Sequence, residues 1–187
     1  MRITGGELGG RRLRAPDSAE IRPMRDQVRA ALFNILMDVV EDSVFLDLFA
    51  GTGSVGLEAL SRGASRAVFV DRGREARELL QQNIDELDLS DRAEIRADDV
   101  SDAITRLEQL DERFDLVFVG PPYGRDLAPT TLDQLSASRV LAPDAIVVAE
   151  VFKKESVADA YGRLARFDQR EYGDNRLVLY RLLARSD

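Results

Sequence analysis

The chain has no cysteine and no histidine among its 187 residues. Their absence excludes a disulfide framework, thiol catalysis, the usual zinc sites and any histidine general base. Catalysis must therefore come from carboxylates, arginine, lysine, tyrosine, hydroxyl groups or the backbone. No apolar run approaches the roughly 18 residues of a membrane span, and the first residues lack the apolar core of a signal peptide. We therefore expect a cytoplasmic protein with no metal site and no membrane partner.

The length and a composition of 44% hydrophobic and 32% charged residues predict one soluble globular unit. The net charge of −8 at first argues against a nucleic-acid partner, but the charge is unevenly distributed. Residues 1–30 contain seven arginines and four acidic residues, a net charge of +3, so the remainder carries −11. The arginines therefore mark a candidate binding surface.

Residues 1–23 form a glycine- and arginine-rich arm. Such an arm can lie along a phosphate backbone, and a solvated, partly mobile terminus explains the composition equally well. Ile3 and Leu13, with four glycines between them, suit a short hairpin. Next, an apolar stripe predicts a helix over 24–40, and Arg25 and Arg29 lie on the opposite face of this helix. The stripe consists of Val28, Leu32, Ile35, Leu36 and Val39.

The stretch VFLDLFAGTGSVG at 44–56 combines an apolar strand with a glycine-rich turn. Gly51, Gly53 and Gly56 supply G-x-G-x-x-G where a helix begins, and Asp71 follows the next apolar run about 20 residues on. Glycines allow a tight turn and the close approach of a ligand, and free N–H groups at a helix N-terminus favour polar groups. This context favours a cofactor-binding turn over a merely structural one.

Strand and helix patterns alternate through most of the remaining chain. Such alternation predicts a mostly parallel, doubly wound α/β sheet with helices on both faces. The last two strands are separated only by a turn at 172–175, so the last strand should be antiparallel. Seven strands closing in this way are typical of a class I methyltransferase, whereas a nicotinamide-binding domain would continue with another crossover. We predict strands at 44–49, 67–71, 93–97, 114–119, 145–151, 167–172 and 177–183, and helices at 55–62, 74–87, 100–110, 127–138 and 155–164.

Ligands of such sheets lie outside the carboxyl ends of the strands. Asp71, after the second strand, is placed to accept hydrogen bonds from both hydroxyls of a ribose, or else to cap the next helix. Of Asp98 and Asp99, after the third strand, one can accept from an adenine amino group while the other caps a helix; both can also be caps alone. Asp47, inside an apolar strand, needs backbone amides of the glycine turn or a cofactor ammonium as partner.

The fourth strand ends in Gly120-Pro121-Pro122-Tyr123. Two prolines stop the sheet and remove two N–H donors, which leaves carbonyl groups free to face a pocket. Tyr123 then offers a flat face on which a base can stack, the alternative being a proline-rich turn with a packed tyrosine.

Several of these stretches together resemble the RsmD-like family of S-adenosylmethionine-dependent methyltransferases, which modify the N2 of a guanine in small-subunit (16S) ribosomal RNA. The resemblance rests on DLFAGTGSVGLEALSRGA at 47–64, RPMRDQVRAALFNIL at 22–36 and PPY at 121–123. RITGGELGGRRL at 2–13 is similar to the family's basic arm, and YGDNRLVLYR at 172–181 to its closing hairpin. The resemblance covers almost the whole chain. We therefore expect residues 1–40 to form the arm and helix, and residues 41–187 to form the methyltransferase domain.

The resemblance implies S-adenosylmethionine as cofactor and small-subunit ribosomal RNA, or an assembling 30S particle, as partner of a monomer. Catalytic positions are then Gly120, Pro121, Pro122 and Tyr123. Cofactor-binding positions are Asp47, Phe49, Gly51, Gly53, Asp71, Asp98 and Asp99. RNA-binding positions are Arg2, Arg11, Arg12, Arg14, Arg22 and Arg25, and the only lysines, Lys153 and Lys154, either extend this surface or begin a solvated helix.

One position departs from the family pattern. Relatives carry Asp or Asn directly before Pro-Pro-Tyr or Pro-Pro-Phe, where its oxygen accepts from the target amine, whereas this chain has Gly120. Losing such an acceptor costs on the order of 10²–10³ in rate. The chain is then a weakened enzyme, an inactivated enzyme, or an enzyme in which another carboxylate compensates. Glu150 is the candidate carboxylate nearest to the corner by topology, although a surface or capping role is the simpler explanation for this residue. Two other functions stay open, a non-catalytic RNA-binding assembly factor and a nicotinamide-dependent oxidoreductase.

Overall fold

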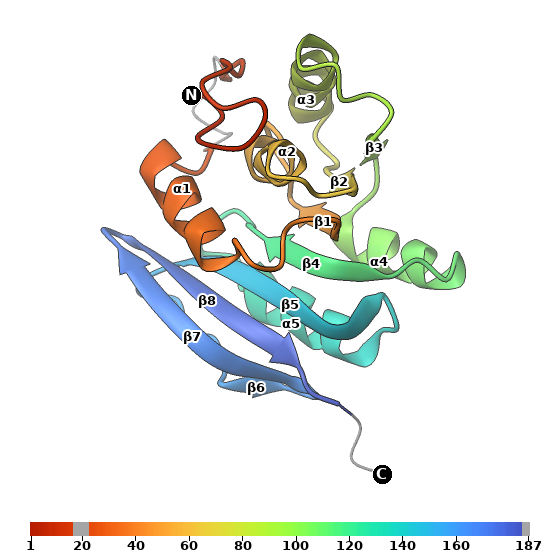
Figure 1. Ribbon diagram of the computed structural model, residues 1–187. Helices are drawn as coiled ribbons and strands as arrows, with labels where there is room; N and C mark the ends of the chain where they lie inside the picture. Colours follow the sequence, from red (N-terminus) through yellow and green to blue (C-terminus); the bar gives the residue numbers. More distant parts are fainter. Residues whose placement is uncertain (17–22, 185–187) are drawn as a thin grey trace.

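A single mixed β-sheet organises the chain in the computed structural model, which describes residues 1–16 and 23–184 (Figure 1). The strands are β1 (Val44–Leu48), β2 (Arg66–Val70), β3 (Ala93–Arg96), β4 (Phe114–Val119), β5 (Leu141–Phe152), β6 (Ala160–Tyr161), β7 (Leu164–Tyr172) and β8 (Asn175–Leu182). The helices are α1 (Asp26–Ile35), α2 (Ser54–Ser61), α3 (Arg74–Glu86), α4 (Val100–Gln109) and α5 (Leu127–Ala137).

The strand order is β3-β2-β1-β4-β5-β8-β7-β6. Strands β1 to β5 pair in parallel, and β8 pairs antiparallel with both β5 and β7. This confirms the doubly wound α/β sheet and its antiparallel closing strand. The order reverses between β1 and β4, the switch point at which such sheets bind ligands.

The prediction of a helix over 155–164 is wrong, and across the described residues the sheet has eight strands rather than seven. This segment instead forms a loop and the two-residue strand β6, which pairs with β7. Gly162 adopts a left-handed conformation (φ 52°) at the turn between them, and Val157 is buried in the core, so side-chain burial and turn geometry override helical spacing. Lys153 therefore begins no helix, and its Nζ lies 2.5 Å from Asp174 Oδ1.

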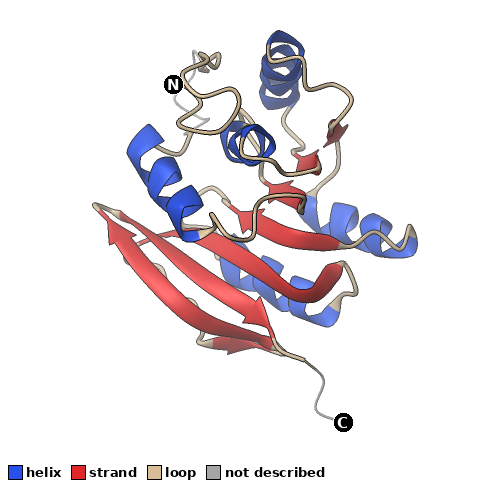
Figure 2. Ribbon diagram, in the orientation of Figure 1, coloured by secondary structure: helices blue, strands red, loops and turns tan. Residues whose placement is uncertain are grey.

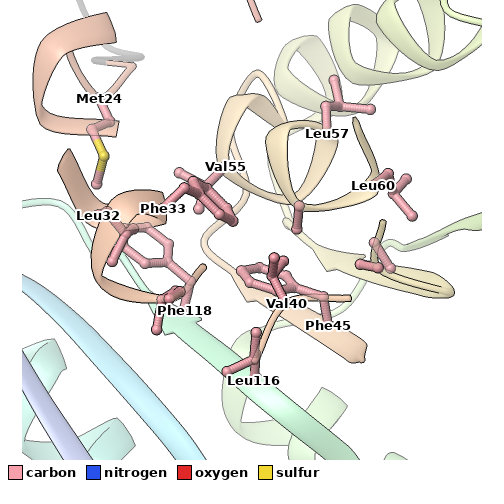
Figure 3. Packing of buried hydrophobic residues seen from close by; sticks show 14 of the residues in the cluster. Met24, Leu32, Phe33, Val40, Phe45, Val55, Leu57, Leu60, Leu116 and Phe118 are labelled. Carbon is pink, nitrogen blue, oxygen red and sulfur yellow. The ribbon is translucent and has the colours of Figure 1, made fainter. Parts of the chain in front are cut away.

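Figure 2 shows helices on both faces of the sheet, and each face has its own apolar core. Helices α4 and α5 pack on one face, and α1, α2 and α3 on the other, together with the arm residues Ile3 and Leu13. Side chains of α1, α2, β1 and β4 meet closely on this second face, as Figure 3 shows for Leu32, Phe33, Phe45, Val55, Leu116 and Phe118. In the described residues, no helix is long and apolar enough to cross a membrane.

The arm forms the short hairpin that was predicted, with one antiparallel bridge between Arg2 and Arg12. The helix that follows is shorter than predicted, because the chain turns after Leu36 and leaves Val39 41% exposed. Arg29 was expected on the exposed face, and this is wrong, since it is 0% exposed.

Arg29 is buried because it is part of a polar network around Glu58 of α2. Arg29 Nε donates to a Glu58 oxygen at 3.1 Å, Arg62 Nε at 2.8 Å, and Thr4 through its backbone N at 2.8 Å and its hydroxyl at 2.7 Å. Burial raises the pKa of Glu58, but the hydrogen bonds from Thr4, Arg62 and Arg29 together bring the pKa below its ordinary value. The network thus joins the arm, α1 and α2.

Replacing Arg29 with alanine should destabilise the protein by about 3 kcal/mol, because it removes one partner of a buried ion pair. Arg25→Ala, at the exposed residue directly before the same helix, is the matched control and should change stability by less than about 0.5 kcal/mol. Urea unfolding of both variants measures the difference. Equal losses would contradict a structural role for the network.

Candidate functional site

Several predicted site residues directly follow the paired ends of neighbouring strands. The last paired residues are Leu48 with Val70 and Val119, and these pair in turn with Arg96 and Ala149. The next residues along the five strands are therefore side by side: Phe49, Asp71, Ala97, Gly120 and Glu150. We call this line the carboxyl edge. Asp71 and Tyr123 thus follow strands that flank β1 on the same edge, as a shared pocket requires.

The glycine turn at this edge has a structural reason for each of two glycines. Gly53 caps α2 in a left-handed conformation (φ 74°), and a Cβ there would lie 2.2 Å from Leu80 Cδ1. A Cβ on Gly56 would lie 2.3 Å from the ring of Phe69 in β2. Only glycine lets α2 approach the sheet this closely, so the helix N-terminus lies at the end of β1.

Phe49 adopts a left-handed backbone conformation (φ 64°) directly after β1. This conformation costs a residue with a side chain roughly 1–2 kcal/mol and is held here by tertiary packing, since the ring contacts the core beside α4 and α5. Strain of this kind concentrates at functional turns.

Asp47 of β1 is 1% exposed and accepts a hydrogen bond of 2.9 Å from Gly56 N in the first turn of α2. One of the two partners predicted for it, the backbone of the glycine turn, is therefore present. Burial raises the pKa of Asp47 to about 8; the Gly56 hydrogen bond lowers it and nearby Asp71 raises it. An approaching cation would favour the charged form.

Asp71 connects two backbone segments of the edge. Its Oδ2 accepts from Gly51 N and its Oδ1 from Gly73 N, both at 2.8 Å. Each carboxylate oxygen has a second lone pair, so the group can still accept from a ligand. Asp71 therefore fixes the glycine turn relative to the start of α3.

The aspartates after β3 have different surroundings. Asp99 caps α4 by accepting from Ser101 N at 3.2 Å, which is one of the two roles expected for the pair. Asp98 forms an ion pair of 2.5 Å with Arg106, and its side chain is 16% exposed. The division of roles leaves Asp98 as the candidate acceptor for a base.

The Pro-Pro-Tyr corner, residues 120–123, follows β4. Gly120 N donates to Leu48 O at 3.3 Å, which keeps the start of the corner beside β1. A Cβ on Gly120 would lie 2.6 Å from Phe118 Cε1, so the Phe118 ring occupies the space that a side chain at position 120 would need. The ring of Tyr123 lies 6.0 Å from that of Phe152 and is tilted by 41°.

Glu150 is neither a surface acid nor a helix cap, although the sequence made that its simpler role. It is 7% exposed and accepts a 2.6 Å hydrogen bond from Asn175 Nδ2. Burial raises its pKa, partly offset by hydrogen bonds with Asn175 and Tyr123. No sequence signal pointed to Asn175, which lies 25 residues away.

The predicted RNA-binding arginines separate into two groups. All five that the structure describes are exposed. Arg11 and Arg14 donate hydrogen bonds to Glu86 at the end of α3, and the other group consists of Arg2, Arg12 and Arg25. Arg22 lies outside the described residues.

The structure also shows a link that the sequence did not reveal. Asn83 of α3, fully buried, accepts from Arg14 N at 2.7 Å and donates to Thr52 O at 3.1 Å. It thereby connects the arm to the glycine turn. In the described part of the chain, no three acidic side chains group as metal ligands would.

Comparison with known proteins identifies the family of the chain. The family model described as "Conserved hypothetical protein 95" matches residues 1–181. The chain belongs to this family. A relative in it, ribosomal RNA small subunit methyltransferase D of Escherichia coli strain K12, is 38% identical over 150 residues, covering 80% of this chain and 74% of the relative. The resemblance drawn from the motifs is therefore confirmed.

Two further matches to the family span nearly the full length. A Bacillus subtilis protein provisionally described as an rRNA methyltransferase is 30% identical over 97% of this chain and 98% of its own. A solved structure from Escherichia coli, provisionally described as a methyltransferase, superposes with a TM-score of 0.85 at 32% identity and covers 99% of both chains. Arm, helices and closing hairpin thus belong to the shared architecture.

The pKa of Asp47 predicts how stability depends on pH. The folded carboxyl keeps its proton up to pH about 8, whereas the group ordinarily releases it near 3.8, so this residue's contribution to stability is lost as pH rises through that window. Asp47→Asn can still accept from Gly56 and does not titrate. We expect the free energy of unfolding of the wild type to fall relative to the variant between about pH 5 and pH 8. A difference independent of pH in urea titrations would contradict the assignment.

Proposed function

We propose that this protein transfers a methyl group from S-adenosylmethionine to the exocyclic N2 of a guanine in small-subunit ribosomal RNA. The observation that carries the proposal is that Asp71 and the start of the Pro-Pro-Tyr corner lie on one carboxyl edge, beside the glycine turn that holds Asp47. The family of the chain includes ribosomal RNA small subunit methyltransferase D. Methyl transfer from a sulfonium is chemically simple, so the main task of the protein is to position the guanine amine beside the methyl group.

The residues of the edge fit this cofactor. Asp47 suits its ammonium group, because a buried carboxylate next to Asp71 gains from a positive partner. Asp71 suits the ribose hydroxyls, and Asp98 suits the adenine amino group. The turn that the cofactor would contact is shaped by Gly51, Gly53 and the strained Phe49. Asp99 supports this region as a helix cap. When bound, the cofactor would supply a sulfonium methyl group. The C–S electron pair would stay with sulfur as the amine forms the N–C bond, and the amine proton would pass to water.

The corner would receive the base. Tyr123 can stack against a guanine that has left its helical stack, and the carbonyls of Gly120 and Pro121 are the acceptors that this motif still offers to its amine. Pro122 is exposed and lies three residues after the end of β4, where its ring prevents the sheet from continuing.

The partner we propose is small-subunit ribosomal RNA, free or in an assembling 30S particle, bound by a monomer in the cytoplasm without metal. The exposed Arg2, Arg12 and Arg25 are positioned for phosphate contacts, and Arg11, Arg14 and Arg22 complete the proposed basic arm. We assign residues 1–40 to RNA capture and residues 41–187 to methyl transfer.

Gly120 favours a second candidate, an RNA-binding assembly factor that has lost turnover. The two are separated by a labelled-methyl transfer assay on small-subunit particles that lack the modification. RNA binding without methyl incorporation would contradict the enzyme and support the assembly factor.

Gly120→Asp should restore an acceptor at the corner at a cost in packing, because the Phe118 ring must move. Gly120→Ala carries a similar packing cost without the carboxylate. We expect the aspartate variant to transfer methyl groups on the order of 10²-fold faster than the alanine variant in single-turnover assays. Thermal unfolding should show that both variants have lost stability.

Equal rates for the two Gly120 variants would show that a carboxylate at this position does not assist transfer. Repeating the pair in a Phe118→Leu background, which empties the contested space, controls for a misplaced aspartate.

The arm should contribute to RNA affinity through salt-sensitive phosphate contacts. We expect Arg12→Gln to weaken binding and to reduce the slope of log K against log salt by about one. Arg139→Gln, exposed just before β5 at the opposite edge of the sheet, is the control and should leave the slope unchanged. Equal slopes for both variants would remove Arg12 from the interface.

A further inference from the structure

Glu150 lies next to the position where the family's catalytic side chain is missing. Val119 pairs with Ala149, so Gly120 and Glu150 are the next neighbours on adjacent parallel strands, whose backbones are about 4.8 Å apart. Side chains alternate between faces along a strand. Phe118 and Val148 both belong to the core under α1 and α2, so Glu150 projects to the face toward which a side chain at position 120 would also point.

Glu150 also contacts the corner that would receive the base. It forms hydrogen bonds with Asn175 Nδ2, at 2.6 Å, and with Tyr123. Asn175 pairs with Phe152 across the β5–β8 ladder, and Phe152 packs against the Tyr123 ring. The tyrosine is therefore in contact with strand β5 at both its ring and its polar group.

The loops on both sides are held together by another carboxylate. Glu155 accepts from Phe152 N at 2.9 Å and from Gly124 N, directly after Tyr123. Glu155 thus joins the loop after β4 and the loop after β5 in one hydrogen-bonded unit. Within that unit, Glu150 is the buried acid closest to the corner along the strand.

We propose that Glu150 is a positioning residue that fixes Tyr123 for stacking on the target guanine, and that it thereby compensates in part for the missing side chain at Gly120. This inference rests on the proposed function. Its chemical basis is that a small displacement of a reacting group can lower the rate on the order of 10²-fold. Holding the Tyr123 ring in place therefore offsets part of the methyl-transfer rate that is lost without an acceptor at position 120. Burial favours a fixed carboxyl because water does not compete for its hydrogen bonds.

The test compares Glu150→Ala, Glu150→Gln and Tyr123→Phe with Glu171→Gln, a control at an exposed acid of the β7–β8 hairpin. We expect Glu150→Ala to lower the single-turnover methyl-transfer rate at least about tenfold at saturating RNA, with unchanged affinity for S-adenosylmethionine. Glu150→Gln should retain more activity, because its amide oxygen still accepts a hydrogen bond. The double variant Glu150→Ala with Tyr123→Phe should be no slower than the slower single variant.

A Glu150→Ala rate equal to that of the Glu171→Gln control, or single effects that multiply in the double variant, would overturn the inference. Ring ¹³C resonances of Tyr123, assigned with Tyr123→Phe, give a readout that needs no turnover. Glu150→Ala should shift them and Glu171→Gln should not. If wild-type protein binds RNA but transfers no methyl group, the proposed function fails, and unshifted Tyr123 resonances would separately reject the placement by Glu150.

Discussion

Close packing of α2 on β2 at Gly56 is the constraint on which the site depends. With no side chain at this position, the first turn of α2 reaches the sheet, and Gly56 N meets the buried Asp47. The glycine turn then lies within hydrogen-bonding distance of Asp71. A larger residue would displace the helix from Phe69 and separate these groups, so one missing methyl group controls the geometry of the whole candidate cofactor turn.

The arm is part of this arrangement rather than an appendage. Thr4 and Arg29 satisfy the buried Glu58 on α2, and Asn83 connects Arg14 with Thr52 in the glycine turn. A segment rich in arginine is thus held by a few specific contacts, while other arginines of the same segment remain exposed. The same residues that complete the core also fix where the exposed guanidinium groups lie.

Local patterns predicted much of the fold and part of the candidate site. The parallel order, the glycine turn and the closing hairpin follow from short motifs whose geometry depends on near neighbours. Burial of Arg29 and Glu150 could not be predicted, because it depends on Glu58 and Asn175, which are 29 and 25 residues away. The helix predicted over 155–164 failed for the same reason, since pairing with β7 and burial of Val157 decide that segment.

Because the Phe118 ring lies beside Gly120, a side chain is harder to add at position 120 than to remove. Removing a side chain from position 120 leaves a gap that an aromatic ring can enter, whereas adding one back meets that ring at 2.6 Å. A side chain at position 120 is therefore accommodated best when position 118 carries a smaller residue.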